Sequence, residues 1–362
     1  MEANGSGTPD AAWVAARQGE FRAALAGFDH AKPVLVLGHH DADGLSSTAI
    51  LCRALRRAGH AAEVRVLGRG ENVWSPEMAA ELSGREMGGL IVADLGTRAE
   101  PPHPGVPTVL IDHHVPTGVP EAALLIGGHG LSPTPTTSLL AWWCAAAIGE
   151  ANDLLWLAAI GIIGDMEESA GFAELAAARE RWGITALRNA VSLVNAPRRA
   201  SAGDAGPALA LLMKADGPKE VTSGEQPETA ALVAAKAEVQ AALAEGRRAA
   251  PRIQGNVAII PIHSACQIHP LIAQQWKGRL KGKVVIAANT GYRPGWVNFA
   301  ARAGSTTDLI RFLADHRPEG ADPIQYGNGH PQASGGALDA AAWNRFVAGL
   351  GFGADLEVPV PP

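Results

Sequence analysis

Continuous apolar runs in the first half of the chain predict buried parallel strands. The clearest runs cover residues 33–37, 89–92 and 107–111, and they are rich in aliphatic and β-branched residues. Unbroken runs of this kind are typical of strands that are covered on both faces. A helical segment at 46–58 and a strand at 62–67 lie between the first two runs. This alternation predicts an α/β fold with a parallel, doubly wound sheet.

In the middle of the chain, helical patterns replace the alternation of strands and helices. Helices are expected at 137–148, 153–163 and 184–194, so the first domain is expected to comprise residues 1–195. Four prolines break the segment that follows: Pro197, Pro207, Pro218 and Pro227. An alanine-rich stretch at 228–249 comes next and predicts a long helix. Residues 196–255 are therefore expected to form a helical linker.

A second, smaller α/β domain is expected over residues 256–354. Its apolar segments predict strands at 256–262, 283–288 and 296–300 and helices at 306–316 and 339–350. No internal repeat is evident in the sequence.

Composition narrows the classes of protein to which the chain can belong. Of the 362 residues, 47% are hydrophobic and 18% are charged, which is typical of a globular protein of about two domains. The formal net charge of -6 argues against a broad basic surface that grips long nucleic acids. Bound divalent cations would still allow a small anionic substrate.

The sequence favours a cytoplasmic protein without a membrane partner. The apolar stretches at 139–148 and 154–163 are too short to cross a bilayer, and the start lacks the features of a signal peptide. Cys52, Cys144 and Cys266 are far apart and are expected to be reduced core residues. A monomer and an oligomer are both compatible with the sequence.

Acids and histidines follow several of the predicted apolar elements. After the first strand, His39, Asp41 and Asp43 alternate with other residues, so in an extended segment their side chains would point the same way. In open α/β sheets, ligands bind beyond the carboxyl ends of the strands. The alternative interpretation is that Asp43 is a helix cap and His39 a surface residue.

Three further acidic positions strengthen the metal-binding interpretation. Asp94 follows the second apolar run, although alone it is more typical of a turn or a cap. Asp112-His113-His114 follows the third run, where two adjacent histidines are costly without a partner. Asp165 ends an apolar helix. Each has an ordinary structural interpretation, but together they supply the ligands of a two-metal hydrolytic site.

These segments resemble the DHH phosphoesterase superfamily, whose name is the triplet seen here as Asp112-His113-His114. The resemblance also comprises the H-x-D-x-D-G segment from His39 to Gly44, the single acid Asp94 and the final acid Asp165. The tail at 327–335 resembles the glycine-rich GGGH motif of the DHHA1 domain. The resemblance implies a DHH domain joined by the helical linker to a DHHA1-type substrate-binding domain.

The resemblance also implies a role for each site residue. One metal ion would be bound by His39, Asp41 and Asp94, and the second by Asp43, Asp94, His113 and Asp165. Asp112 would orient the histidines beside it, and His114 would contact the phosphate. His40 is an alternative ligand, although the spacing favours His39. Carboxylates and imidazoles suit two Mn²⁺ ions, with Mg²⁺ or Co²⁺ as substitutes, in phosphodiester hydrolysis.

The resemblance places substrate contacts in the second domain. Arg302 is the expected phosphate-binding guanidinium, and the tail would contribute Gly327, Asn328, Gly329, His330 and Ser334. The chain departs from the family pattern at Asn328, which replaces a glycine, and at Ala300, which replaces a serine. On local sequence alone, such a glycine-rich loop is more typical of a simple turn.

Other conspicuous residues have simpler interpretations. Trp142 and Trp143 are expected in the core, with a base-stacking surface as the alternative. His263 and His269 are expected to be structural, with a position lining the cleft as the alternative. Trp74 has loop-like surroundings, where it would either stack on a base or cover the core.

The leading hypothesis is a metal-dependent phosphodiesterase that acts on short nucleic acids or small nucleotides held between the two domains. The acidic charge and modest length favour short substrates, whereas the compact H-x-D-x-D-G spacing and the linker helix favour a RecJ-like exonuclease on single-stranded DNA. An inorganic pyrophosphatase of the same superfamily is disfavoured, because the Lys- and Arg-rich anion-binding signature of its second domain is not found in this sequence. A nucleotide-binding regulator without catalysis is the alternative from another class.

Overall fold

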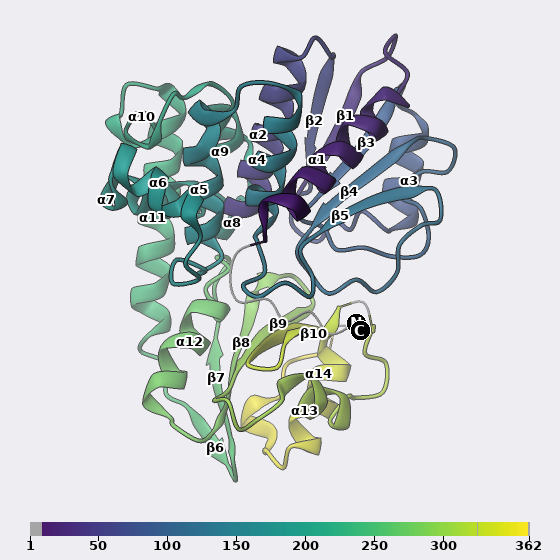
Figure 1. Cartoon of the computed structure of the whole chain (residues 1–362). Coiled ribbons are helices and arrows are strands. Elements are labelled where there is room, and N and C mark those ends of the chain that lie inside the picture. The colour runs from purple at the N-terminus through teal and green to yellow at the C-terminus, as the bar shows by residue number, and fades with distance from the viewer. Residues whose placement is uncertain (1–8, 324, 361–362) are drawn as a thin grey trace. The chain divides into compact units, whose positions relative to one another are not determined.

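The computed structural model describes residues 9–323 and 325–360. The chain divides into two compact units. The first unit contains the residues up to Arg198 together with Gly203–Ala234, and the second contains Arg199–Ala202 together with the residues from Ala235 onward (Figure 1). Each unit has its own sheet, so the two are described separately.

A five-stranded parallel sheet forms the centre of the first unit, with the strand order β2-β1-β3-β4-β5. Its strands are β1 (Val34–Gly38), β2 (Ala62–Val66), β3 (Gly89–Ala93), β4 (Thr108–Asp112) and β5 (Ala123–Gly127). The predicted parallel α/β fold is confirmed. The sequence analysis missed β5, a half-buried strand at the edge of the sheet.

Helices cover both faces of this sheet. The helices in this part of the chain are α1 (Ala11–Ala26), α2 (Ala42–Arg57), α3 (Pro76–Ser83), α4 (Thr137–Ile148), α5 (Leu155–Gly164), α6 (Ala173–Trp182), α7 (Ile184–Val194), α8 (Ala196–Arg199), α9 (Gly206–Lys214) and α10 (Pro218–Ser223), with a short 3-10 helix at Asn152–Leu154. The helix α1 was not anticipated from the sequence. The long helix α11 (Pro227–Gly246) passes from the first unit into the second.

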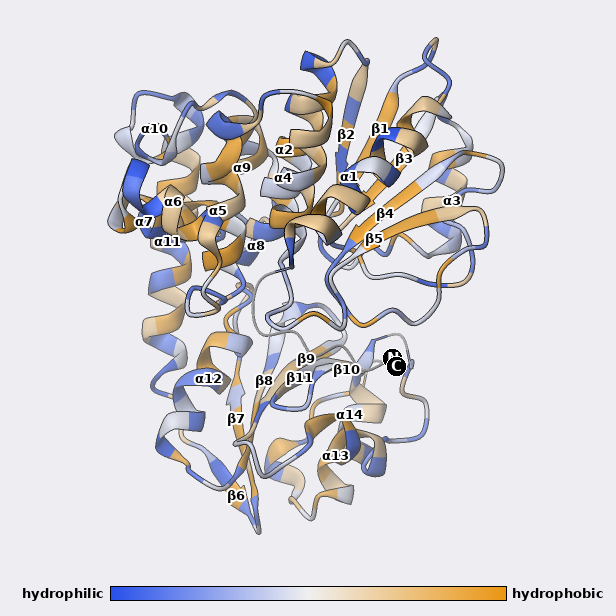
Figure 2. Cartoon of the chain, in the orientation of Figure 1, coloured by the Kyte–Doolittle hydropathy of each residue, from blue (hydrophilic) through white to orange (hydrophobic). Residues whose placement is uncertain are grey.

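Alternate residues of the central strands enter two different cores. Val36 and Ile91 pack with the large helical layer that contains α2, α4 and α5, whereas Leu37 and Val92 pack with Met78 and other residues around α3. Because successive side chains of a strand point to opposite faces, both sets must be apolar. Burial on both faces explains the unbroken apolar runs, and Figure 2 shows them as orange strands.

The second unit contains a six-stranded mixed sheet with the order β10-β11-β9-β8-β7-β6. Its strands are β6 (Arg252–Gln254), β7 (Val257–Ile262), β8 (Val284–Arg293), β9 (Trp296–Arg302), β10 (Tyr326–His330) and β11 (Ala333–Asp339). Only β7 and β8 are parallel neighbours among the described strands of this sheet. The helices are α12 (His269–Arg279), α13 (Leu309–Asp315) and α14 (Ala340–Gly349), with a 3-10 helix at Ala354–Leu356.

The glycine-rich tail differs from its expected form. It was expected as a loop, but β10 and β11 pair there as an antiparallel hairpin. Gly335 lies where a Cβ atom would overlap the backbone of Phe299 and Ala300 in β9, so glycine allows the neighbouring strand to approach. Within the described part of the chain, no helix is long and apolar enough to cross a membrane.

Candidate metal centre

The carboxyl ends of β1, β3 and β4 meet at one edge of the sheet. Gly38 of β1 is paired with Ala93 of β3, and Ala93 is paired with Ile111 of β4. The residues that follow these strands are therefore brought together. They are His39 and Asp41 after β1, Asp94 after β3, and His113 and His114 after β4.

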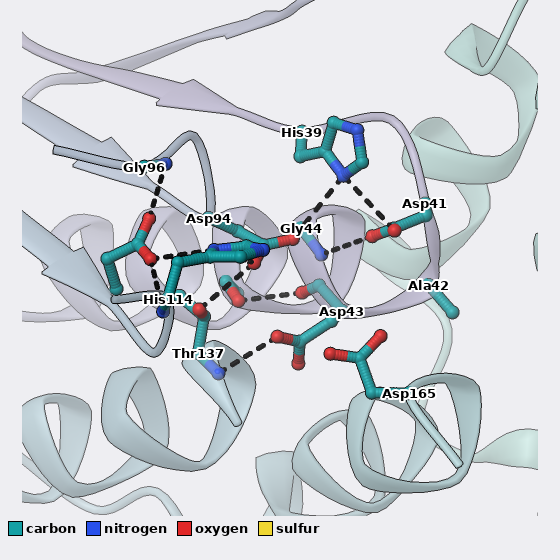
Figure 3. A network of polar contacts seen from close by, with 12 residues as sticks. His39, Asp41, Ala42, Asp43, Gly44, Asp94, Gly96, His114, Thr137 and Asp165 are labelled. Carbon is teal, nitrogen blue, oxygen red and sulfur yellow. Dashed lines mark hydrogen bonds and ion pairs between the residues drawn. The ribbon is translucent and has the colours of Figure 1, made fainter. Parts of the chain in front are cut away.

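Asp41 has an extended backbone but Asp43 is helical, so the segment after β1 is not extended throughout as the sequence-based expectation required. Asp41 is the N-cap of α2, where its Oδ1 accepts a hydrogen bond of 3.1 Å from the backbone N–H of Gly44. Asp43 already belongs to the first turn of the helix. The N-cap bond starts the helix at Ala42 rather than near Ser46, because it satisfies one of the free amides of the first turn. Asp41 and Asp43 still reach the same cluster (Figure 3).

Asp94 lies at the centre of the cluster and has a strained backbone. Its φ of 63° is in the left-handed region, which residues other than glycine rarely adopt. The Nδ1 atom of His39 lies 3.4 Å from Asp94 Oδ2, whereas Nε2 of His113 lies 3.5 Å from Asp94 Oδ1. Only 4% of Asp94 is exposed. Burial raises its pKa well above the usual range, and the charges of Asp43 and Asp41 add to this effect.

His114, the second histidine after β4, is held by hydrogen bonds to Asp112, the last residue of that strand. Its Oδ1 accepts from the backbone N–H of His114 at 2.7 Å and contacts Nδ1 of the same residue at 2.8 Å. Its Oδ2 accepts from the backbone N–H of Gly96 at 2.7 Å. Burial alone would lower the pKa of His114, but the hydrogen bond and charge of Asp112 raise it to about 9. These contacts hold His114 in a fixed direction relative to Asp112.

Asp43 and Asp165 complete the cluster from the helical layer. Asp43 accepts from the backbone N–H groups of Thr137, at 2.8 Å, and Ser138, at 2.9 Å. Asp165 follows α5 as its C-cap, and its Oδ2 lies 3.4 Å from Nε2 of His113. Burial raises the pKa of Asp165, and the carboxylates around it raise it further.

The predicted metal ligands fall into overlapping groups. In each group the potential ligand atoms lie within 4.8 Å of one another. The groups are His39, Asp41 and Asp94; Asp43, His113 and Asp165; and Asp94, His113 and His114. All six predicted ligands are brought together, and Asp94 and His113 are each shared between groups.

The chemistry of the cluster fits divalent cations. Asp41, Asp43, Asp94 and Asp165 lie together, and the arginine paired with them in the described part of the chain is Arg198, whose Nη1 is 3.7 Å from Asp41 Oδ2. Several buried carboxylates so close together repel each other unless positive charge is added. Oxygen and imidazole ligands suit ions such as Mg²⁺ and Mn²⁺. The residues present therefore fit the implied metal ions.

Sequence reasoning missed three residues that support this cluster. Asn195 Oδ1 accepts a hydrogen bond of 3.0 Å from the backbone N–H of Ala42, 153 positions away. Arg198 contacts Asp41, and Thr137 contacts both Asp43 and Asp94. No local motif marks these residues.

His40, the alternative ligand considered from the sequence, packs its ring against His39 with 4.5 Å between the ring centroids. It belongs to none of the ligand groups found among the described residues. The geometry therefore favours His39, as the spacing of the motif does.

The predicted substrate contacts in the second unit are only partly brought together. Arg302 and Ser334 line one cavity of about 380 Å³, and Gly335, Gly336 and His269 also line it. Gly327, Gly329 and His330 lie in β10, with His330 exposed at its end, and they do not line this cavity. The backbone of Asn328 is in the same strand, but its side chain lies outside the described part of the structure.

His269 was expected from the sequence to be structural, with lining of the cleft as the alternative, and it lines the cavity that Arg302 also lines. It is the first residue of α12, is 5% exposed, and its Nδ1 has no hydrogen-bond partner among the described residues. Burial, together with the charge of Arg302, lowers its pKa to about 3. Burial also lowers the pKa of Arg302. The cavity thus combines a half-buried cation with a neutral imidazole.

Comparisons with known proteins agree with this architecture. No protein-family model matches the chain, and no curated protein matches its sequence. A solved structure of exonuclease RecJ bound to manganese is 20% identical, with a TM-score of 0.69, and the match covers 92% of this chain and 93% of that one. RecJ from Thermus thermophilus in complex with Mn²⁺ has the same identity and TM-score.

The match to the Thermus protein covers 96% of this chain but 55% of that one, so this chain spans about half its length. The DHH domain of a protein assigned to a family of ribosomal proteins is 13% identical, with a TM-score of 0.64 over 96% of this chain and 93% of that one. At such identities the likeness shows a shared fold. The chain therefore shares the fold of exonuclease RecJ and of this DHH-domain protein.

Proposed function

We propose that the chain is a two-metal phosphodiesterase that hydrolyses short oligonucleotides or small nucleotide phosphodiesters. The observation that carries this proposal is the pair of ligand groups around Asp94 and His113. One ion would be held by His39, Asp41 and Asp94. The other would be held by Asp43, Asp94, His113 and Asp165. Mn²⁺ is the proposed metal, with Mg²⁺ or Co²⁺ as substitutes.

When bound, two such ions would supply positive charge that stabilises a displacement at phosphorus. The protein residues around them prepare the site. Asp112 holds the ring of His114 through Nδ1, which leaves Nε2 of that ring to contact a phosphate oxygen. Asp43 is held by two backbone amides, so its direction is set before a metal ion binds. Such preorganisation lowers the reorganisation that the reaction requires.

The net charge of -6 supports short substrates, because long nucleic acids are bound mainly through many basic contacts. The likeness to RecJ supports the alternative of an exonuclease that acts on single-stranded DNA. A nucleotide-binding regulator without turnover is the alternative from a different class. The complete ligand set favours catalysis over that alternative.

A substrate panel tests these proposals. We expect the metal-free protein to be inactive and Mn²⁺ to allow hydrolysis of dinucleotides and short RNA or DNA faster than long strands. Chelation should remove this activity, and renewed Mn²⁺ should restore it. Products are measured from end-labelled oligonucleotides and from cyclic dinucleotides. Faster digestion of long single-stranded DNA would move the assignment to the RecJ-like exonuclease, and tight nucleotide binding without products would favour the regulator.

Arg302 is proposed to bind a terminal phosphate of the substrate. A hydrogen bond to a charged group contributes about 1.5–3 kcal/mol, which corresponds to roughly 10–100-fold in binding. We therefore expect Arg302→Gln to raise KM by about that factor for substrates with a terminal phosphate. The same substrates without that phosphate should be affected much less. Steady-state kinetics on both substrates measure the difference.

Arg311→Gln is the matched control for this variant. Arg311 lies in the same unit but is exposed, and it faces Asp315 at 3.8 Å. Its replacement should leave the kinetics of both substrates unchanged. An equal loss on both substrates in Arg302→Gln would show that Arg302 acts on the structure of the unit and not on the phosphate.

A further inference from the structure

The first turn of α4 contacts two of the proposed metal ligands through one residue. The backbone N–H of Thr137 donates to Oδ2 of Asp43 at 2.8 Å, and its hydroxyl donates to Oδ1 of Asp94 at 3.1 Å. Thr137 is buried. Figure 3 shows its contacts with the carboxylates. Asp43 comes from α2 and Asp94 follows β3, so Thr137 joins two elements that are far apart in the sequence.

These two contacts act on the carboxylates in different ways. Asp43 accepts amide hydrogen bonds on both of its oxygens, and the amides at a helix N-terminus carry partial positive charge. That contact depends on the backbone of α4. Asp94 receives its contact from the hydroxyl of Thr137, so this contact depends on the side chain alone.

The two oxygens of Asp94 face different ligand groups. Oδ2 lies toward His39, and Oδ1 lies toward His113. A carboxylate that is shared between two ions must keep its plane in a defined direction. The bond from Thr137 to Oδ1 opposes rotation of this plane. The strained backbone of Asp94 restricts the side chain at its other end.

Other contacts hold the first turn of α4 in place without the Thr137 hydroxyl. Ser138 Oγ donates to the backbone carbonyl of Ala158 in α5 at 3.2 Å and lies 3.1 Å from Oγ1 of Thr136. Ser138 also supplies the second amide to Asp43. The packing of α4 on α5 and the direction of Asp94 therefore depend on two different hydroxyl groups.

We propose that Thr137 is a positioning residue of the metal centre and that its hydroxyl orients Asp94 for sharing between the two ions. This inference rests on the proposed function, because it assigns a role toward the same pair of ions. The ligands themselves are unchanged by it. Thr137 would hold the carboxylate of Asp94 in the direction required for metal binding before the ions bind.

The test removes the hydroxyl and keeps the backbone. Thr137→Val has nearly the same shape and retains the N–H that binds Asp43. Loss of a group that orients a metal ligand commonly weakens metal affinity by 10–100-fold, and we expect a loss of about that size. Mn²⁺ titration followed by electron paramagnetic resonance measures it on the protein without substrate. The variant should also lose the spectral signature of two coupled Mn²⁺ ions, and Thr137→Ser should restore both properties.

Ser138→Ala is the matched control, because it removes a buried hydroxyl from the same turn but keeps the amide that binds Asp43. It should bind Mn²⁺ with nearly the affinity of the unchanged protein. Thermal melting followed by circular dichroism verifies that each variant is folded. Thr137→Ala supplies a second variant without the hydroxyl should Thr137→Val fail to fold.

The outcomes separate the inference from the proposed function. Normal Mn²⁺ binding and a normal coupled signal in Thr137→Val would overturn the inference and leave the proposed function intact. Equal losses in Thr137→Val and Ser138→Ala would also overturn it, because the turn would then act only through packing. Absence of Mn²⁺ binding in the unchanged protein would overturn the proposed function and the inference with it.

Discussion

Replacement of Asp94 by asparagine is expected to stabilise the metal-free protein and, at the same time, to abolish metal-dependent hydrolysis. Asp94 is 4% exposed, and this burial raises its pKa, with a further contribution from the charges of Asp43 and Asp41. Removing its charge relieves the repulsion. Asparagine also adopts the left-handed backbone conformation of this position as readily as aspartate does.

The loss of activity follows from the position of Asp94 between the ligand groups. It approaches both His39 and His113, so its replacement affects both proposed ions. Two-metal stabilisation is worth several kcal/mol in the transition state, and about 4 kcal/mol corresponds to roughly a 10³-fold loss of kcat/KM. The measurements are Mn²⁺-dependent hydrolysis and the melting temperature of the chelator-treated protein.

Asp112→Asn is the matched control for the stability effect. Asp112 is equally buried, but its carboxylate accepts hydrogen bonds from Gly96 and His114, so its charge is compensated. In asparagine, one of the two carboxylate oxygens is replaced by an NH₂ group. This group would face the N–H of Gly96 or of His114, so that two donors would meet without an acceptor. We expect the free energy of unfolding to fall by about 1–3 kcal/mol in the metal-free protein. If Asp94→Asn lowered the melting temperature as Asp112→Asn does, repulsion at Asp94 would not be the dominant effect.

The parts of the fold that were predicted correctly are those with a strong local pattern. The strands β1, β3 and β4 are buried on both faces, so each is an unbroken apolar run that ends at a polar residue. The strand β5 has the same length but was missed because it is half-buried at the sheet edge. The helix α12 was missed because its sequence, HPLIAQQWKGR, has no clear apolar period.

In the candidate site too, residues marked by a local sequence pattern could be proposed from the sequence, whereas contacts between residues far apart in the chain could not. The six proposed ligands could be found because acids and histidines at the ends of apolar elements are conspicuous. The exact start of α2 was wrong, because the extended interpretation ignored the capping ability of Asp41. Once Asp41 caps the helix, Asp43 reaches the cluster from the first helical turn.

The supporting residues could not be found in this way. Thr137 acts on Asp43 through its backbone N–H, which every residue except proline possesses. Asn195 contacts the backbone of Ala42 across 153 positions. His269 has an ordinary sequence context, and its importance is visible only when Arg302 lies near it. Such contacts depend on the assembled fold and leave no local pattern in the sequence.

Gly161→Ala is expected to damage the metal centre although it places a better helix former in α5. In a helix interior, alanine is normally more favourable than glycine by about 0.5–1 kcal/mol. Gly161 is buried, however, and a Cβ atom there would overlap Ser138 Oγ and Asp43 Oδ1 and would lie 2.6 Å from Ser138 Cβ. Overpacking of this kind costs about 1–3 kcal/mol, so the intrinsic gain should be outweighed.

The displaced atoms determine the functional effect. Ser138 holds α4 on α5, and Asp43 Oδ1 accepts the Ser138 amide. The extra methyl group must push α4 and Asp43 away from Asp165, and a displacement of about 1 Å at a reacting centre can cost roughly 10²-fold in rate. We therefore expect both the melting temperature and Mn²⁺-dependent hydrolysis to fall in Gly161→Ala.

Gly19→Ala provides the control for helix propensity. Gly19 lies inside α1, and a Cβ atom there would have no neighbour within 4 Å. This variant should gain about 0.5–1 kcal/mol in the free energy of unfolding and keep its activity. Chemical denaturation and Mn²⁺ titration of both variants separate the two effects. A Gly161→Ala protein that gained stability as Gly19→Ala does, with unchanged Mn²⁺ affinity, would show that α4 and α5 are not packed tightly enough to set the position of Asp43.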